Sequence, residues 1–478
     1  DRMSWLADAS ANKIVKSYIQ DFVDISGNFK VRNTLSETVD TGPVAWSQLG
    51  SDINGEAAGD RFGASVSINS DGTIMAVSGS TNDGNGSDSG HVRIYEYIGS
   101  AWSQLGADID GEASGDQSGF SVSLSSDGTI VAIGAWRNDS NGTYSGHTRI
   151  YEYNGSSWTQ LGSEIVGESA GDNAGFSVSL SSDGTIVAIG ALNNDGNGAE
   201  AGHTRVYEYD GSSWTQLGSD IDGEAAGDLF GNAVSLSSDG TIVACGAYRN
   251  DGNGVDSGHV RIYKYNGSSW NQLGSDIDGE ASGDLFGFSV SLSSDGTIVA
   301  IGAILNYGNG AEAGHVRVYE YDGTSWNQLG SDIDSEAAGD WSGRSVSLSS
   351  DGTILAVGAD KNDGNGTDSG HIRIYEYSGS SWNQLGSDID GEASGDRSGC
   401  SVSISSDGSR VAIGANTNSG NGTQAGHVRV YNKTGGVVTT QESIDTMDVS
   451  GGTVSFIGTS VENYITTNTY SYSTAQLG

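Results

Sequence analysis

Apolar and polar residues alternate in short runs along most of this chain, and the same runs return every 56 residues. In the copy at residues 118–162, an alternating run from Gly119 to Leu124 is followed by a Ser-Asp-Gly turn and a small apolar run from Thr129 to Ala135. A third run, from His147 to Tyr153, leads through an Asn-Gly turn into the run from Ser157 to Gly162. Period-two alternation between glycine turns is typical of strands joined by hairpins. Each copy therefore predicts four antiparallel strands.

The period of 56 residues is marked by one histidine and one Trp-x-Gln-Leu-Gly segment in each copy. The histidines are His91, His147, His203, His259, His315, His371 and His427, and the tryptophans are Trp46, Trp102, Trp158, Trp214, Trp270, Trp326 and Trp382. A four-stranded sheet with two apolar faces cannot bury both alone, so neighbouring copies must cover each other around a closed ring. We therefore predict an all-β fold, a seven-bladed β-propeller of four-stranded antiparallel blades with a 56-residue repeat.

The closure of the ring is predicted from where the copies begin and end. The segment Trp46–Gly50 precedes any first strand, and the last copy continues beyond Tyr431 into 437–440, which lacks the Trp-x-Gln-Leu-Gly pattern. We expect the Trp46 strand to complete the seventh blade, with 437–440 as the competing candidate. The predicted domains are an N-terminal extension at 1–44, the propeller at 45–441 and a β-rich C-terminal extension at 442–478.

The two extensions differ in composition from the repeats. Residues 7–22 predict a short helix, because one stripe of it would hold Ile14, Tyr18, Ile19 and Phe22. The segments Asp24–Val31 and Asp448–Val454 share an Asp-(Ile/Val)-Ser-Gly cadence. These strands are similar to linker units of viral and phage fibre proteins, which implies that the extensions attach or oligomerise the propeller. The alternative is a pair of edge strands packed on the rim.

The repeats themselves resemble a known family. The run from Gly119 to Ala135, and the Phe62-Gly63 pair with Gly79 in the first copy, resemble FG-GAP repeats, the blades of integrin-alpha-type propellers. The resemblance implies an extracellular binding or adhesion propeller. The integrin-type calcium loop between the first two strands is replaced here by a Ser-Ser-Asp-Gly-Thr turn, so no calcium ligand is carried over from the family.

The charge of the chain excludes several classes of partner. The formal net charge is -40, with 21 lysines and arginines. Binding to nucleic acid depends on basic residues that displace counterions from phosphate, so neither nucleic acid nor an anionic membrane surface is an expected partner. No apolar run of about 18 residues is present, so we expect no membrane insertion. Cys245 and Cys400 occupy different positions in the repeat, and we interpret both as free thiols.

Differences among the copies gather in the loop that enters the first strand and in the loop after the second strand. In a meander these two loops lie at one end of the ring, and they carry large apolar and cationic residues, namely Arg61, Phe62, Trp136, Arg137, Leu229, Phe230, Tyr248, Arg249, Trp341 and Lys361. Such side chains are typical of interaction surfaces. We interpret this end as a binding face for a protein or glycan, the alternative being drift at solvent-exposed positions.

The loop after each Trp strand has carboxylates at positions one, three, five and nine around a glycine turn. The sets are Asp108, Asp110, Glu112 and Asp116; Asp220, Asp222, Glu224 and Asp228; and Asp276, Asp278, Glu280 and Asp284, with related loops in the other copies. Oxygen ligands in this spacing predict a calcium site. The final bidentate glutamate of an EF-hand is missing, and the alternative is a solvated acidic turn whose aspartate side chains cap backbone N–H groups.

The histidine strand does not indicate catalysis. His91, Arg93 and Tyr95 share one face, and if buried between blades they need partners such as the acidic loops. No nucleophile–base set stands out from the repeat, so we expect no enzyme. The leading hypothesis is a binding or adhesion propeller, extracellular or on a virion surface, with a protein or glycan partner. A multivalent lectin with repeated inter-blade glycan sites is the second, and a hydrolase or lyase in the central channel is the third.

Overall fold

The computed structural model describes residues 14–17, 33–40, 42–444, 446–448 and 455–457. The chain divides into two compact units, Trp46–Lys433 and the two terminal segments 1–45 and 434–478. Within the described residues the regular elements are all strands. No helix there is long and apolar enough to cross a membrane.

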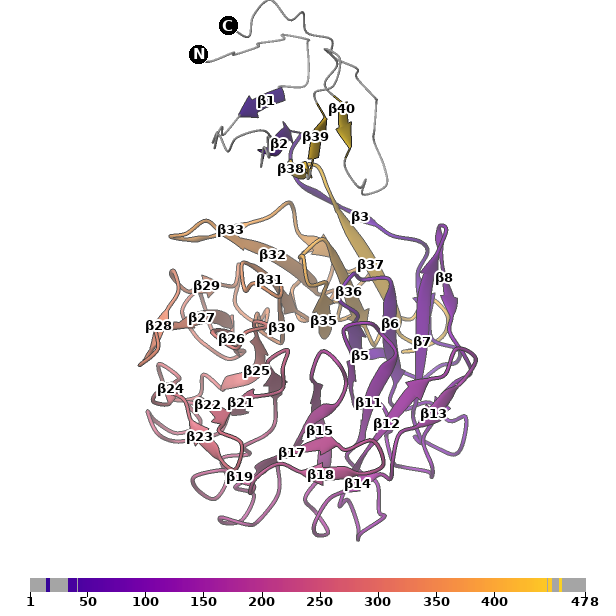
Figure 1. Ribbon diagram of the computed structural model, residues 1–478. Helices are drawn as coiled ribbons and strands as arrows, with labels where there is room; N and C mark the ends of the chain where they lie inside the picture. The colour runs from indigo at the N-terminus through magenta and orange to yellow at the C-terminus, as the bar shows by residue number, and fades with distance from the viewer. Residues whose placement is uncertain (1–13, 18–32, 41, 445, 449–454, 458–478) are drawn as a thin grey trace, which may run out of the picture. The chain divides into compact units, whose positions relative to one another are not determined.

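Residues Trp46–Lys433 form seven antiparallel sheets arranged as the blades of a ring (Figure 1). In the second blade, β10 (Ser121–Leu124), β11 (Ile130–Ala135), β12 (His147–Tyr153) and β13 (Trp158–Gln160) are hydrogen-bonded in that order. The short β14 (Ile165–Val166) pairs with the start of β12, on which Tyr151 lies opposite Gln160 and Thr148 opposite Ile165. The outer strand is thus one strand interrupted by a bulge. The predicted seven-bladed, four-stranded architecture is confirmed.

The other blades repeat this order. The first is β5 (Phe62–Ile68), β6 (Ile74–Gly79), β7 (His91–Ile98), β8 (Ala101–Gln104) and β9 (Ile109–Asp110); the third is β15 (Ala174–Leu180), β16 (Ile186–Ala191), β17 (His203–Tyr209), β18 (Trp214–Gln216) and β19 (Ile221–Asp222). The fourth is β20 (Val234–Leu236), β21 (Ile242–Ala247), β22 (His259–Tyr265), β23 (Trp270–Gln272) and β24 (Ile277–Asp278); the fifth is β25 (Phe286–Leu292), β26 (Ile298–Ala303), β27 (His315–Tyr321), β28 (Trp326–Gln328) and β29 (Ile333–Asp334). The sixth is β30 (Ser345–Leu348), β31 (Ile354–Ala359), β32 (His371–Tyr377), β33 (Trp382–Gln384) and β34 (Ile389–Asp390).

The seventh blade joins the two ends of the ring. Its inner strands are β35 (Ser401–Ile404), β36 (Arg410–Ala415) and β37 (His427–Thr434), and its outer strand is β3 (Ala45–Gln48) with β4 (Ile53–Asn54). The prediction that the Trp46 strand completes this blade is therefore confirmed. The competing segment 437–440 belongs to β38 (Val437–Ile444), which pairs with β2 (Asn33–Asp40) instead.

Serines tie the first strands together around the axis. The Ser70 N–H donates to the Ser126 carbonyl at 2.9 Å, and the equivalent bonds continue from blade to blade until the Ser406 N–H reaches the Ser70 carbonyl at 2.8 Å. A second ring uses side chains, as in the bond from the Leu124 N–H to Ser67 Oγ at 3.0 Å. Serine at alternate positions of the first strand thus bridges to the next blade, while the intervening valine and leucine fill the space between blades.

Blade faces approach most closely at the second strand. A Cβ on Gly134 would lie 2.0 Å from the Gly175 carbonyl oxygen of the next blade, so only glycine fits there. Farther from the axis larger side chains fill the gap, and one such cluster includes Ile150, Val187 and Tyr207 with Trp214 packed against it. Small residues inside and aromatic residues outside therefore match the widening space between blades.

The terminal segments contain a second, smaller sheet and a hairpin. β1 (Ile14–Ser17), β2 and β38 form a three-stranded antiparallel sheet, and β39 (Thr446–Asp448) pairs with β40 (Ser455–Ile457). The helix predicted over 7–22 is wrong at 14–17, where β-branched Ile14 and Val15 favour a strand that pairs with β2. The rest of that predicted helix, the segment Asp24–Val31 and residues 449–454 lie outside the described residues.

Candidate functional sites

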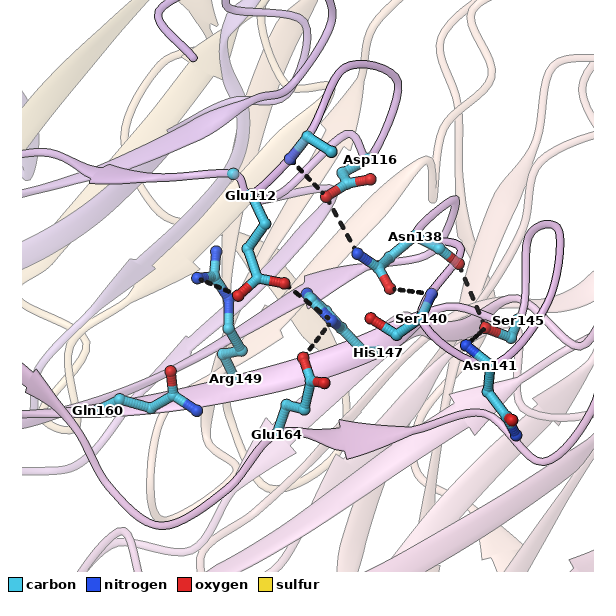
Figure 2. Close-up of polar contacts among 12 residues, drawn as sticks. Glu112, Asp116, Asn138, Ser140, Asn141, Ser145, His147, Arg149, Gln160 and Glu164 are labelled. Carbon is cyan, nitrogen blue, oxygen red and sulfur yellow. Dashed lines mark hydrogen bonds and ion pairs between the residues drawn. The ribbon is translucent and has the colours of Figure 1, made fainter. Parts of the chain in front are cut away.

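A polar network recurs at the interface between consecutive blades, and Figure 2 shows the one around His147. His147 begins β12 and is 1% exposed. Its Nδ1 lies 3.9 Å from Glu112 Oε2 of the preceding blade and 3.0 Å from Glu164 Oε2 of its own blade. Burial, and then the neighbouring Arg149, lower the pKa of His147 to about 3. The imidazole is therefore neutral at physiological pH.

Arg149 joins the same two blades. Its Nη2 donates to the Asp110 carbonyl at 2.8 Å, and its Nη1 lies 3.4 Å from Glu112 Oε1. The same bond to a carbonyl of the blade before is made by Arg205, Arg261, Arg317 and Arg429. These four and Arg149, with Arg93 and Arg373 at the same position of the repeat, are called the framework arginines below. In the first blade, Arg93 instead contacts its own Asp108 with two hydrogen bonds, of 2.9 and 2.8 Å. The arginine thus neutralises the acidic loop and links the blades.

The carboxylate at position nine of the acidic loop points into the protein. Asp116 is 3% exposed and accepts hydrogen bonds from the Ala113 N–H and from Asn138 Nδ2, both at 3.0 Å (Figure 2). The Asn138 side-chain oxygen in turn accepts the Ser140 N–H at 2.8 Å. This aspartate therefore caps a backbone N–H of its own turn, as the alternative interpretation of the acidic loop expected, but it is buried rather than solvated and also holds the loop between the second and third strands.

The other two predicted calcium loops have the same arrangement. Asp228 and Asp284 are buried and accept the N–H groups of Ala225 and Ala281, as Asp116 does that of Ala113. Glu224 and Glu280 reach Arg261 and Arg317 of the next blade. Asp220 and Asp276 accept from glutamine side chains, and Asp110, Asp222 and Asp278 are exposed. Calcium at this loop stays a prediction, with carboxylates that already have arginine, glutamine and backbone partners.

Each interface also gathers one histidine and two carboxylates. Potential ligand atoms of Glu56, His91 and Asp108 lie within 4.8 Å of one another, and equivalent groups recur around the ring. The Arg93 guanidinium contacts both Glu56 and Asp108 in this group. Because a cationic side chain already occupies the position between the carboxylates, we interpret these groups as part of the framework.

The end of the ring where the first strands begin and the second strands end is called the variable end below. Here the structure brings together most of the predicted binding-face residues. Trp136, Arg137, Tyr248, Trp341 and Lys361 are half-buried, and Arg61 and Arg249 are exposed. Tyr144, Val255 and Tyr307, three of the four exposed large hydrophobic residues among the described side chains, lie in the loops that follow the second strands.

Three of the predicted binding-face residues do not face solvent. Phe62 and Phe230 are fully buried and Leu229 is 5% exposed, so the expectation that they project from the ring is wrong. The Phe230 N–H bonds across the interface to the Ala201 carbonyl at 3.0 Å, and Arg261 lies over its ring at 4.8 Å. The phenylalanine is therefore an inter-blade packing residue beneath the framework arginine.

In every blade, the residue before the position of Phe62 and Phe230 in the repeat has a left-handed backbone. Arg61, Leu229 and Trp341 have φ values of 52°, 55° and 59°. The Leu229 N–H donates to the carbonyl of Glu200, which itself has a φ of 55°. Left-handed geometry is costly for residues other than glycine or asparagine, by about 1 kcal/mol. The cross-blade hydrogen bonds hold this strain at the variable end.

Aromatic rings cluster where the second and third blades meet at this end. The centroid of Phe120 lies 5.2 Å from that of Trp136 and 4.7 Å from that of Phe176, and Arg137 lies 4.4 Å above the Trp136 ring. Phe120 is not among the predicted binding-face residues, because the alternating pattern assigns it to a strand. Comparison of copies marks it nevertheless, since the equivalent residues are Ala64, Phe176, Asn232, Phe288, Arg344 and Cys400.

The chain was compared with protein-family models and with curated proteins. The model of the FG-GAP repeat family matches residues 107–151, 220–263, 276–319 and 334–375. Each match begins near the acidic loop of one blade and ends in the third strand of the next. The chain matches no protein in the curated set.

Proposed function

The chain is an FG-GAP repeat β-propeller, and from that premise we propose that it is a binding or adhesion module that presents its variable end to a protein or glycan partner. The partner belongs to a cell or virion surface, and the module acts outside the cell. In this role the framework residues hold the ring together, and recognition rests on side chains that differ from blade to blade.

The observation that carries this proposal is the uneven distribution of differences among the repeats. The serine rings of the first strands and the tryptophans of the outer strands have the same partners around the ring. The variable end instead has aromatic and cationic residues that differ from blade to blade. Tryptophan, tyrosine and arginine are the residues that contribute most to interfaces.

The placement of positive charge supports the same end. Apart from the seven framework arginines, nine lysines and arginines occur in 46–433. Six of them belong to the variable end, namely Arg61, Arg137, Arg249, Arg344, Lys361 and Arg397. The acidic loops lie at this end too, so these cations stand among carboxylates, and we expect them to contact negative or polar groups of a partner.

The test uses binding of the full chain to an array of immobilised glycans and extracellular protein domains. Phe120→Asn and Trp136→Leu replace aromatic residues with those at the equivalent positions of other blades, Asn232 and Leu192. We expect these variants to lose at least tenfold in affinity for any array partner. Thr129→Ser, which lies at the opposite end and copies Ser409, is the matched control and should bind like the parent. Equal effects of both kinds of variant would count against the proposal.

A second candidate function is a lectin with one site per blade interface. A small pocket between the fifth and sixth blades is lined by Asp332, Asp334, Tyr375 and Trp382, which are residues of the repeat. Aromatic rings beside carboxylates suit a saccharide. A glycan stoichiometry near seven would support this function, and one site per chain would reject it.

A further inference from the structure

Blade six has a buried carboxylate at a position where the residue differs from blade to blade. The residue directly after the second strand is Asp360, and its equivalents in the other blades are Ser80, Trp136, Leu192, Tyr248, Ile304 and Asn416. The Asp360 side chain is only 3% exposed, and its Oδ1 has no hydrogen-bond partner among the described residues. A buried carboxylate oxygen without a donor is costly, by roughly 1–3 kcal/mol or more. Such a group indicates a ligand that supplies the missing donor.

Three cations surround this carboxylate without hydrogen-bonding to it. Arg344 Nε is 3.8 Å from Asp360 Oδ2, and the Arg344 guanidinium lies 4.9 Å above the Phe288 ring. Lys361 Nζ lies 3.2 Å from the centre of the Trp341 ring. Burial raises the pKa of Asp360 and the negative charge of Asp368 raises it further, while the positive charges of Arg344, Arg397 and Lys361 lower it. Three cations and two carboxylates, Asp360 and Asp368, therefore interact in this group.

The neighbouring blade adds a second unpaired acceptor. Asn416 occupies the position equivalent to Asp360 in blade seven, and its Oδ1 is also buried without a partner among the described residues. Cys400 belongs to blade seven, where its Sγ lies 3.5 Å from the Gly63 carbonyl of blade one. It interacts with the backbone of Asn416 and electrostatically with Asp360 and Arg344, so within the described part of the chain it connects two acceptors that lack donors.

A ligand that completes this group must donate hydrogen bonds and carry negative charge. Hydroxyl groups provide the donors and a carboxylate or sulfate provides the charge, and both occur together on an acidic sugar. We propose that the group formed by Arg344, Asp360, Lys361, Arg397 and Asn416 binds an anionic saccharide. Its hydroxyls donate to Asp360 Oδ1 and Asn416 Oδ1, and its acidic group lies against the two arginines and the lysine. This inference rests on the proposed function and names the class of ligand.

Calorimetric titration of the full chain tests the proposal with three tetrasaccharides. The probes are a hyaluronan tetrasaccharide for the carboxylate, a chondroitin sulfate tetrasaccharide for the sulfate, and maltotetraose as the neutral control. We expect at least one acidic probe to bind, at least tenfold more tightly than maltotetraose and more weakly as salt is raised. Affinity for maltotetraose equal to that for both acidic probes, or no binding of either acidic probe, overturns the proposal.

Variants that copy residues of other blades locate the site. Arg397→Gln copies Gln117, and Asp360→Ser copies Ser80, so both residues are known to fit the ring. Each substitution should lower the affinity for the acidic probe at least tenfold. The melting temperature should stay close to that of the parent, so that unfolding does not explain the loss of affinity. Lys264→Asn, which copies Asn432, removes an equal charge from an exposed strand position outside the variable end and should leave affinity within twofold. Equal losses in Lys264→Asn and Arg397→Gln overturn the proposed location.

The outcomes separate this inference from the proposed function. If neither acidic probe binds while array binding still depends on Trp136, the saccharide site is wrong and the binding face stands. If array binding is insensitive to every substitution at the variable end, the proposed function fails as well.

Discussion

Trp46 Nε1 donates a hydrogen bond to the Leu385 carbonyl at 2.8 Å, across 339 positions of the sequence. The same bond links consecutive blades elsewhere, as from Trp102 to Leu49 and from Trp158 to Leu105. The closing contact of the ring is therefore chemically the same as the contacts inside it. It differs only in chain order. The strand of Trp46 is the outer strand of its blade, yet it comes before the other strands of that blade in the sequence.

This relationship predicts the cost of removing one indole N–H. Trp46→Phe leaves the Leu385 carbonyl without its donor, and we expect the free energy of unfolding to fall by about 1–2 kcal/mol. Trp214→Phe makes the same change at an internal interface and should cost a similar amount at equilibrium. Urea denaturation of both variants measures the effect. A loss below about 0.3 kcal/mol for each would contradict the role given to this bond.

Gly134 should tolerate no side chain, although blade one has Ser78 at the equivalent position. In Gly134→Ala the new Cβ meets the Gly175 carbonyl oxygen at 2.0 Å, so neighbouring blades must separate and stability should fall by about 3 kcal/mol or more. Gly155 is the matched control, because its φ is 91° but no atom lies within 4 Å of its Cβ position. Gly155→Ala should cost about 1 kcal/mol from backbone strain alone. Similar melting temperatures for the two variants would show that the close approach is not rigid.

Acid should destabilise the propeller through its buried histidines. The pKa of His259 is lowered to about 4 from a usual 6.5, because burial and Arg261 outweigh the attraction of Asp276 and Asp228, and Glu224 also lies near. The unfolded chain then binds the proton first, so stability falls as pH drops from about 6.5 to about 4 and is unaffected above that range. At pH 5 the loss is roughly 2 kcal/mol for such a histidine.

Denaturation at pH 7 and pH 5 measures this effect in the parent and in His259→Gln. The variant removes one titrating group, so its stability should fall less steeply with acid, by about one proton per molecule. Histidines in other blades have lowered pKa values too, and the parent should lose several times the effect of one site. An identical pH dependence of parent and variant would contradict the assignment of His259 as neutral and buried.

The sequence predicts the structure correctly where every blade uses the same type of side chain for the same role. Alternation of serine with valine or leucine predicts strands, and the period of 56 predicts the ring. Burial was harder to foresee at Phe62 and Phe230, because each lies in a loop whose residues differ among the copies, and this variation suggested that the phenylalanine faces solvent. The Phe230 ring packs beneath Arg261 of its own blade, and its N–H bonds to the Ala201 carbonyl of the blade before.

The candidate sites also depend on contacts between blades that the local sequence does not predict. The alternating pattern assigned Phe120 to a strand, whereas β10 begins at Ser121, and the pattern could not show that Phe120 meets Phe176 of the next blade. The environment of Asp360 depends on Arg344 from its own blade and on Arg397 and Cys400 from the entry to the next. Partners supplied by another repeat have no signature in the local sequence, because the repeats are nearly equal and their contacts cross the interface.

Chelation tests the calcium prediction directly. The carboxylates of the acidic loop already contact arginines, glutamines and backbone N–H groups, so we expect a chelator to leave the melting temperature unchanged within about 1 °C. Scanning fluorimetry with calcium and with a chelator measures this. A rise of several degrees with calcium would instead establish a structural ion, and its loss in Asp110→Asn would place the ion at this loop.

Strain at the variable end predicts a stabilising substitution that impairs binding. Arg61 has a φ of 52° and an exposed side chain, and the equivalent residue in blade three is Asn173, with a φ of 56°. Asparagine tolerates this backbone better than arginine, so Arg61→Asn should raise the free energy of unfolding by about 0.5–1 kcal/mol. The same change removes a cation from the proposed binding face and should weaken array binding. Urea denaturation and array binding of the one variant measure both effects. A gain in stability with unchanged binding would mean that Arg61 lies outside the contact, and a loss of stability would mean that its side chain supports the loop.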